Sequence, residues 1–134
     1  MSKIAELKET LSKKQRPDDV IMAILAKTKG DSIIKDPSKI HQSIYELSIK
    51  NQVWGKYLDA FYFDISGITP FSDLLDQVLS RLETSSLLAT PNPRYEEYHL
   101  KKEFLSRSIK KFDSSEQQTL QDMADEFNNL LYSH

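Results

Sequence analysis

The chain has 134 residues, a formal net charge of −2 and no cysteine, so it has the size of one domain and excludes disulfides, thiol catalysis and cysteine-ligated metal or iron–sulfur sites. No apolar run approaches the roughly 20 residues that span a bilayer, and the first residues, MSKIAELKETLSKKQ, lack an apolar signal core. We therefore expect a soluble, cytoplasmic protein that folds as a single domain over residues 1–134.

Helical spacing of apolar residues predicts three helices in the first part of the chain. Residues 3–15 carry a narrow apolar stripe. A second helix is expected over 18–29, where two aspartates suit the positive end of a helix and Gly30 is a natural stop. Asp36 can cap a third helix, with Pro37 in its first position.

The middle of the chain predicts strands around a leucine-rich helix. Large apolar residues alternate with others over 61–65, which predicts a short strand. The next helix is expected over 70–84, with Thr69 as its cap. Two prolines that flank an asparagine then predict a turn. A further strand is expected over 94–100, paired either with Leu87–Ala89 or with the first strand.

The last part of the chain divides into a basic helix and an acidic helix. Residues 101–112 are predicted as a helix that carries every Lys and Arg beyond position 100, whereas 113–134 carry only acids. The final helix is expected to begin at Ser114, which can form a capping box with Gln117. The apolar residues expected to face inward are Phe104, Leu105, Ile109 and Phe112 in the basic helix and Leu120, Met123, Phe127, Leu130 and Leu131 in the final helix.

Together these elements predict an α+β, mostly helical domain of winged-helix-like layout, with a small sheet and extra helices at both termini. The expected parts are an N-terminal helix (1–16), a winged-helix-like core (17–103) and C-terminal helices (104–134). The apolar stripes of the terminal helices either support a homodimer or wrap the chain's own core, and both interpretations stay open.

Residues from about 20 to 103 resemble small prokaryotic winged-helix-like proteins, including the Panacea antitoxin domain. Ile40–Leu47 match an apolar helix of that pattern, and Phe61–Phe63 match its aromatic strand. Thr69–Ser72 match the start of a leucine-rich helix, with a threonine in place of the family's glycine, and Ser86–Leu88 match its end. The resemblance implies a domain that binds DNA or holds a partner protein such as a toxin.

The helix over 70–84 is the candidate recognition helix. Its outward positions include Gln77, Ser80 and Arg81, which can contact base edges or phosphates. Three acids on the same surface oppose that role, because they repel the DNA backbone. The alternative is a core helix with a solvated polar face. The residues proposed to contact nucleic acid are Gln77, Ser80, Arg81, Arg94, Lys101, Lys102, Lys110 and Lys111.

The predicted strand over 94–100 resembles the wing of such a domain. Arg94 can reach a phosphate, and Tyr95 or Tyr98 can stack on a partner. Glu96 and Glu97 are poor neighbours for a DNA groove. The alternative is a sheet edge on which charges prevent aggregation.

The basic helix is the candidate anion-binding surface, to which lysines and an arginine of the N-terminal helix contribute if that helix packs nearby. In the alternative, its cations pair with the acidic final helix, at up to about 1 kcal/mol per exposed pair. Its basic residues are Lys101, Lys102, Arg107, Lys110 and Lys111.

Catalysis finds little support in the sequence. His41 is expected at a polar helix position, His99 lies on the last predicted strand and His134 ends the chain, and none has a partner at metal-binding helical spacing. We expect no cofactor, no metal and no enzymatic activity. Two functions stay open: a DNA-binding transcription regulator, or a protein-interaction module such as an antitoxin or adaptor with an acidic or basic partner.

Overall fold

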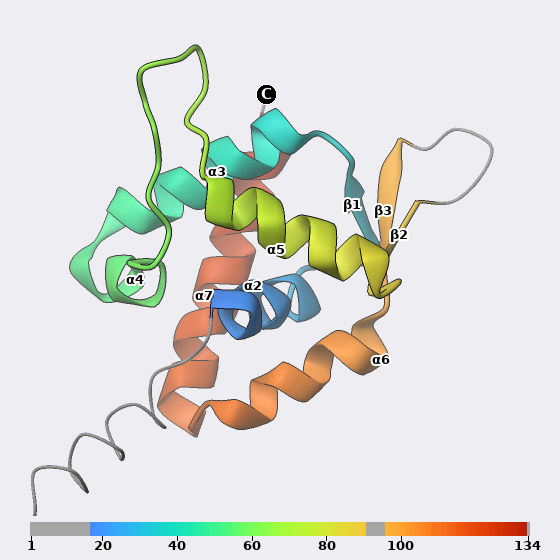
Figure 1. Cartoon of the computed structure of the whole chain (residues 1–134). Coiled ribbons are helices and arrows are strands. Elements are labelled where there is room, and N and C mark those ends of the chain that lie inside the picture. The colour runs from blue at the N-terminus through green and yellow to red at the C-terminus, as the bar shows by residue number, and fades with distance from the viewer. Residues whose placement is uncertain (1–16, 91–95, 134) are drawn as a thin grey trace, which may run out of the picture.

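The computed structural model describes residues 17–90 and 96–133. The domain is α+β and mostly helical, as predicted (Figure 1). Its elements are α2 (Pro17–Ala26), β1 (Ser32–Ile34), α3 (Pro37–Lys50), α4 (Gln52–Tyr57), α5 (Asp73–Thr84), β2 (Leu88–Ala89), β3 (Glu97–Leu100), α6 (Lys102–Leu105), the 3-10 helix η1 (Ser106–Lys111) and α7 (Ser114–Leu131).

The sheet has three antiparallel strands in the order β1-β3-β2. The pairing of β3 with Leu88–Ala89 confirms one of the two predicted pairings. The strand predicted over 61–65 is wrong, because within that segment only Asp64 makes a bridge, and its partner is Phe71. The second neighbour of β3 is β1, in which Ser32 lies opposite His99. Three residues are too few to show a readable alternation, so the sequence did not predict β1.

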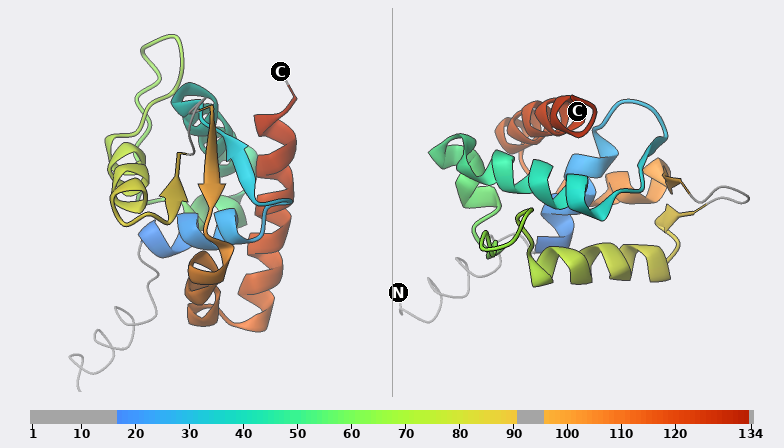
Figure 2. Two further views of the ribbon diagram at one scale, coloured as in Figure 1. Left: turned by 90° about the vertical axis from the view of Figure 1, so that its right-hand side faces the viewer. Right: turned by 90° about the horizontal axis from the view of Figure 1, so that it is seen from above.

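The chain runs from α2 through β1, α3, α4 and α5 to the β2–β3 hairpin. The hairpin lies at one side of the molecule in Figure 1, and α7 runs along the back. Figure 2 shows α7 beside α2 and α3, against both of which it packs. The sheet therefore borders the helices and does not form a layer of its own.

The core is centred on α2, which contacts α5, α6, η1 and α7. Because neighbours surround this helix, Ala23 and Ile24 are both fully buried. The apolar stripe of α7 is buried against the same core. The final helix therefore packs on its own chain, which is the second of the two interpretations given above for the terminal helices. Leu130 is only half-buried, and the predicted N-terminal helix over 1–16 lies outside the described residues. The buried residues of the stripe are Leu120, Met123, Ala124, Phe127 and Leu131.

The helix starts agree in part with prediction. Asp36 caps α3 as expected, accepting a hydrogen bond from the Lys39 amide at 3.2 Å. Helix α5 starts three residues later than predicted, because Ser72 and not Thr69 is its cap. Helix α2 ends at Ala26, short of the predicted 29. For α5, a second residue able to cap a helix lies three positions after the predicted one.

The capping box of α7 is also displaced by one residue. Asp113 accepts a hydrogen bond from the Glu116 amide at 2.8 Å, and Glu116 accepts one from the Asp113 amide at 3.0 Å. The predicted pair, Ser114 and Gln117, has the same spacing, and the structure selects the carboxylate pair one residue earlier. Both carboxylates lie at the positive end of the helix dipole, where negative charge is stabilised.

Helix α4 was not predicted. Asn51 ends α3 and caps α4 at once, because its side chain accepts a hydrogen bond from the Trp54 amide at 2.9 Å. The two helices approach closely at Gly55, where a Cβ atom would lie 2.8 Å from the carbonyl oxygen of Ser48. This contact requires glycine, because any other residue would place its Cβ against the Ser48 carbonyl oxygen.

Candidate interaction surfaces

The segment between α4 and α5, here called the α4–α5 loop (residues 58–72), rises above the helices in Figure 1. Two backbone hydrogen bonds between Asp64 and Phe71, of 2.8 and 3.0 Å, join its two arms. Near the tip, the Asp64 carboxylate accepts hydrogen bonds from the Ser66 amide at 2.9 Å and hydroxyl at 2.6 Å. These bonds lower the pKa of Asp64. The loop is therefore a defined projection with an ionised aspartate.

Large apolar side chains of this loop face solvent. Ile68 is fully exposed, Tyr62 is 82% exposed and Ile65 is 63% exposed. Of the eight large hydrophobic residues exposed in the described part of the chain, four belong to this loop, the fourth being Phe71. A group of exposed apolar side chains on one projection is typical of an interaction site.

The base of the loop is anchored in the core through His41. The Ser72 amide donates a hydrogen bond to His41 Nδ1 at 3.0 Å, and the Phe71 ring stacks on the imidazole at 4.6 Å. His41 is buried, so its predicted polar position is wrong; it faces the loop, which the sequence did not place against α3. Burial lowers the pKa of His41, against the opposing effect of Asp76. The ring is therefore neutral and acts as an acceptor.

A cleft of about 410 Å³ lies between the loop and the start of α5. Its walls include Tyr62, Asp64, Phe71, Asp73 and Gln77. Over residues 57–80 the chain carries four aspartates and no lysine, arginine or glutamate. We call the surface formed by Tyr62, Asp64, Ile65, Ile68, Phe71 and Asp73 the acidic loop surface.

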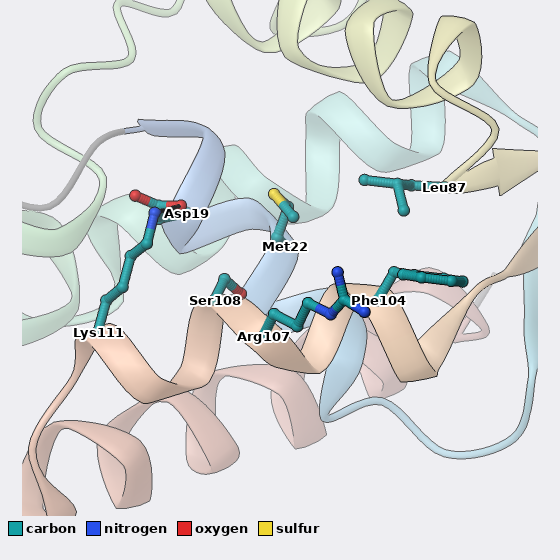
Figure 3. A pocket seen from close by; sticks show the side chains of 7 residues that line it. All are labelled: Asp19, Met22, Leu87, Phe104, Arg107, Ser108 and Lys111. Carbon is teal, nitrogen blue, oxygen red and sulfur yellow. Dashed lines mark hydrogen bonds and ion pairs between the residues drawn. The ribbon is translucent and has the colours of Figure 1, made fainter.

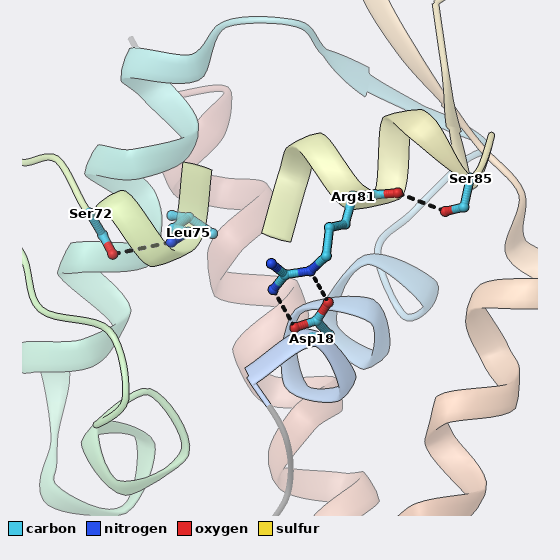
Figure 4. Close-up of polar contacts among 5 residues, drawn as sticks. All are labelled: Asp18, Ser72, Leu75, Arg81 and Ser85. Atoms are coloured by element: carbon cyan, nitrogen blue, oxygen red, sulfur yellow. Dashed lines mark hydrogen bonds and ion pairs between the residues drawn. The ribbon is translucent and has the colours of Figure 1, made fainter. Parts of the chain in front are cut away.

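The candidate recognition helix presents the side chains that were predicted to face outward. Gln77, Ser80 and Arg81 are exposed, and so are the acids of the same helix. Arg81 is held by Asp18 of α2 through two hydrogen bonds, of 2.8 and 2.9 Å (Figure 4). The bond to Asp18 raises the pKa of Arg81. The guanidinium therefore links α5 to α2, and contact with a base would compete with that link.

Of the four lysines proposed to contact nucleic acid, two are engaged within the chain and two are exposed without an ion pair among the described residues. Lys102 donates a hydrogen bond to the Thr28 carbonyl, and burial lowers its pKa. Lys111 forms an ion pair with Asp19 at 3.0 Å. Lys101 and Lys110 are exposed and have no ion pair within the described residues.

These lysines and α5 do not form one continuous surface. Helix α2 lies between α5 and the α6–η1 segment in Figure 1. Arg94 and Tyr95 lie outside the described residues. The expected pairing of the basic helix with the final helix is wrong for Lys102 and Lys111, whose partners lie on and just after α2. Glu126 of α7 instead pairs with Lys50 of α3, at 2.6 Å.

A second cleft, of about 270 Å³, lies between α2 and η1 (Figure 3). We call it the α2–η1 cleft. Met22, Leu87 and Phe104 supply its apolar walls, and the buried Ser108 hydroxyl donates to the Leu105 carbonyl at 2.8 Å.

Phe104 was predicted to face inward, but 42% of it is exposed. After Leu105 the helix changes from α to 3-10 geometry. Ser108 takes a buried position that the sequence assigned to Ile109, which is only half-buried. With three residues per turn in the 3-10 segment, α-helical spacing no longer identifies the inner face.

Cations border the α2–η1 cleft. The Arg107 guanidinium lies over the Phe104 ring, 4.7 Å from its centre. No carboxylate of the described residues forms an ion pair with Arg107. Lys111 lies at the Asp19 end (Figure 3). The cleft thus combines apolar walls with a guanidinium that forms no ion pair with the described carboxylates.

Residues 17–90 and 96–133 contain no group of three His, Asp or Glu side chains arranged to hold a metal ion. His99 is exposed on β3. Among the helices of the same ranges, none combines the length and apolar character needed to cross a bilayer.

Sequence reasoning assigned Phe61 and its neighbours to a strand and so missed the loop. Comparison of the chain with protein-family models, with curated proteins and with solved structures finds no match.

Proposed function

We propose that this chain is a non-enzymatic protein-interaction module, and that the acidic loop surface is its binding surface. The observation that carries the proposal is the full exposure of Ile68 at the tip of a loop whose base is fixed to the core. The resemblance to winged-helix-like antitoxin domains implies the same class of function.

Burial energetics support a partner that covers the loop. Removing a side chain the size of isoleucine from water contributes about 1.5–3 kcal/mol to binding. Ile65, Ile68 and Tyr62 are exposed and would each contribute when a partner covers them. The Asp64–Phe71 bridge and the His41 contacts hold both arms in place before binding. Because the loop is already ordered, binding a partner costs little conformational entropy and offsets less of the free energy gained by burial.

Charge supports a partner with a basic and apolar surface. Asp64 and Asp73 line the cleft beside the loop, and residues 57–80 carry no cation. Such a surface attracts lysine and arginine side chains and repels phosphates. Glu96 and Glu97 are also exposed, so the described end of the hairpin supports the sheet-edge interpretation better than a DNA-contacting wing.

DNA binding is the second candidate, and one observation favours it. Lys101, Arg107 and Lys110 lie on one short segment and are exposed. This hypothesis predicts retention of genomic DNA fragments that falls as salt is raised. Retention should be lost in Lys110→Glu combined with Lys111→Glu and kept in Lys29→Glu combined with Lys56→Glu, the same charge change at two other exposed lysines. No retention of wild type at low salt would refute it.

The protein-interaction proposal is tested by replacing Ile68 with a photo-crosslinking amino acid in the source cell. Position 49 is the matched control, because Ile49 is also an exposed isoleucine but lies on α3. We expect a defined protein adduct from position 68 and none of that mass from position 49.

A quantitative step follows with the purified adduct partner. Ile65→Ser is expected to weaken its affinity at least tenfold, whereas Ile49→Ser leaves affinity unchanged; both isoleucines are 63% exposed. Equal effects of the two substitutions, or no adduct at position 68, would refute the loop as the binding surface.

A further inference from the structure

We infer that the acidic loop surface of one copy of this chain docks on the α2–η1 cleft of a second copy. The inference rests on the proposed function, because it uses the same loop as the binding surface and names one partner for it. The two surfaces have complementary charge, complementary apolar content and positions that exclude contact within one chain.

The charges of the two surfaces are opposite. The acidic loop surface carries two aspartates, Asp64 and Asp73, and no cation, and residues 57–80 as a whole carry four aspartates. The α2–η1 cleft is lined by two cations, Arg107 and Lys111, and one acid, Asp19, and residues 101–111 as a whole carry five Lys or Arg and one Glu. Surfaces of opposite charge within one chain attract one another between copies and speed their encounter.

The apolar parts also match. Ile68 is fully exposed at the loop tip, and the α2–η1 cleft has walls of Met22, Leu87 and Phe104. A dry cavity of roughly 150 Å³ accommodates a benzene ring, so a cleft of about 270 Å³ has room for an isoleucine side chain. Docking would cover Ile68 and the exposed part of Phe104 in one step.

Arg107 supplies a specific contact. Its guanidinium lies over the Phe104 ring, 4.7 Å from the ring centre, and a guanidinium can stack on a ring while its N–H groups donate to a carboxylate. Asp64, near the tip of the loop, and Asp73, at its base, line the same cleft and are the carboxylates available to Arg107. An arginine and a carboxylate form the strongest paired hydrogen bonds when both N–H groups of the fork are used.

The positions of the two surfaces make the contact head-to-tail. The α4–α5 loop rises at one end of the molecule, and η1 lies at the other end, in Figure 1 and in the left view of Figure 2. The loop therefore does not reach the cleft of its own chain. A contact between two different surfaces leaves one of each unused in a dimer, so association continues as concentration rises unless a ring closes.

The test is sedimentation velocity of the full chain across a concentration series at low and high salt. We expect the weight-average sedimentation coefficient of wild type to rise with concentration at low salt and to rise less at high salt. Ile68→Ser and Arg107→Glu are each expected to remain monomeric. The controls Ile49→Ser and Lys29→Glu should behave as wild type, and circular dichroism confirms that each variant is folded.

A mixing experiment tests the pairing directly. Ile68→Ser keeps an intact cleft, and Arg107→Glu keeps an intact loop. An equimolar mixture should therefore form dimers and nothing larger, although each variant alone is monomeric. A mixture that stays monomeric while wild type associates would overturn the loop-in-cleft pairing.

A wild type that stays monomeric at every concentration would overturn self-association itself. If the crosslinker at position 68 still captures a different protein, the proposed function survives that result. If position 68 captures neither a different protein nor a second copy, both proposals fail.

Discussion

Replacing Ser72 with alanine is expected to destabilise the fold by about 1–2 kcal/mol. The Ser72 hydroxyl is fully buried and accepts the Leu75 amide at 3.2 Å at the start of α5 (Figure 4). Loss of a serine cap costs typically about 1 kcal/mol. The Leu75 amide would then lack an acceptor in a buried place, and an unsatisfied buried donor costs about 1–3 kcal/mol. The Ser72 amide keeps its bond to His41, so the loop base persists.

The assay is urea unfolding followed by circular dichroism, with the m-value checked for constancy. Thr69→Ala is the matched control, because the sequence predicted Thr69 as the cap and the structure leaves it in the loop. It should change the free energy of unfolding by less than about 0.5 kcal/mol. A larger loss for Thr69→Ala than for Ser72→Ala would refute the helix start at Ser72.

Three further predictions concern packing and protonation. Gly55→Ala should lower the free energy of unfolding by about 1–3 kcal/mol, because the new Cβ would lie 2.8 Å from the Ser48 carbonyl oxygen. The control Gly67→Ala should be nearly neutral in the same urea assay, because the nearest atom to its Cβ would lie at 3.9 Å. Since burial lowers the pKa of His41 below 6.5, the unfolded chain binds more protons there, and the free energy of unfolding should fall as the pH drops from about 6.5 toward the lowered pKa. His41→Gln should flatten that slope in urea titrations near pH 7 and pH 5.5, and an unchanged slope would contradict the assignment. Burial raises the pKa of Tyr98 to about 12, so ultraviolet titration should show one tyrosine ionising later than the others and Tyr98→Phe should remove that late step.

The helices that bury a wide apolar face were predictable from spacing alone. In α5, Leu75, Val78 and Leu82 recur at helical intervals and are buried. One whole face of the helix must be apolar to pack against the core, and this requirement appears in the sequence as apolar residues at helical spacing. Boundaries depend on smaller differences between neighbouring polar residues, such as Ser72 against Thr69, each of which is an acceptable cap.

The strands and the loop were not predictable for a different reason. A three-residue strand such as β1 owes its form to its partner β3, which is more than 60 residues away in the chain. Phe61, Tyr62 and Phe63 alternate like a strand, yet no partner strand lies beside them. Propensity identifies residues that suit a sheet, and only tertiary pairing decides whether they join one.

Charge was the least predictable part of the candidate site, because residue type does not reveal where a charge is used. Of the residues proposed to hold DNA, Arg81 is bound by Asp18 and Lys111 by Asp19, so two adjacent aspartates of α2 engage one cation on each side of that helix. Arg107, which was named only as part of the basic helix, faces no acid in the described residues. A cation already paired with a carboxylate must give up that contact before it binds a phosphate or a partner's acid, whereas an unpaired guanidinium stacked on an exposed ring gives up only bound water. Substitution of Arg107 should therefore weaken the binding of an anionic partner at this end of the molecule more than substitution of Lys111. The same order should hold whether that partner is DNA or the acidic loop surface of a second copy.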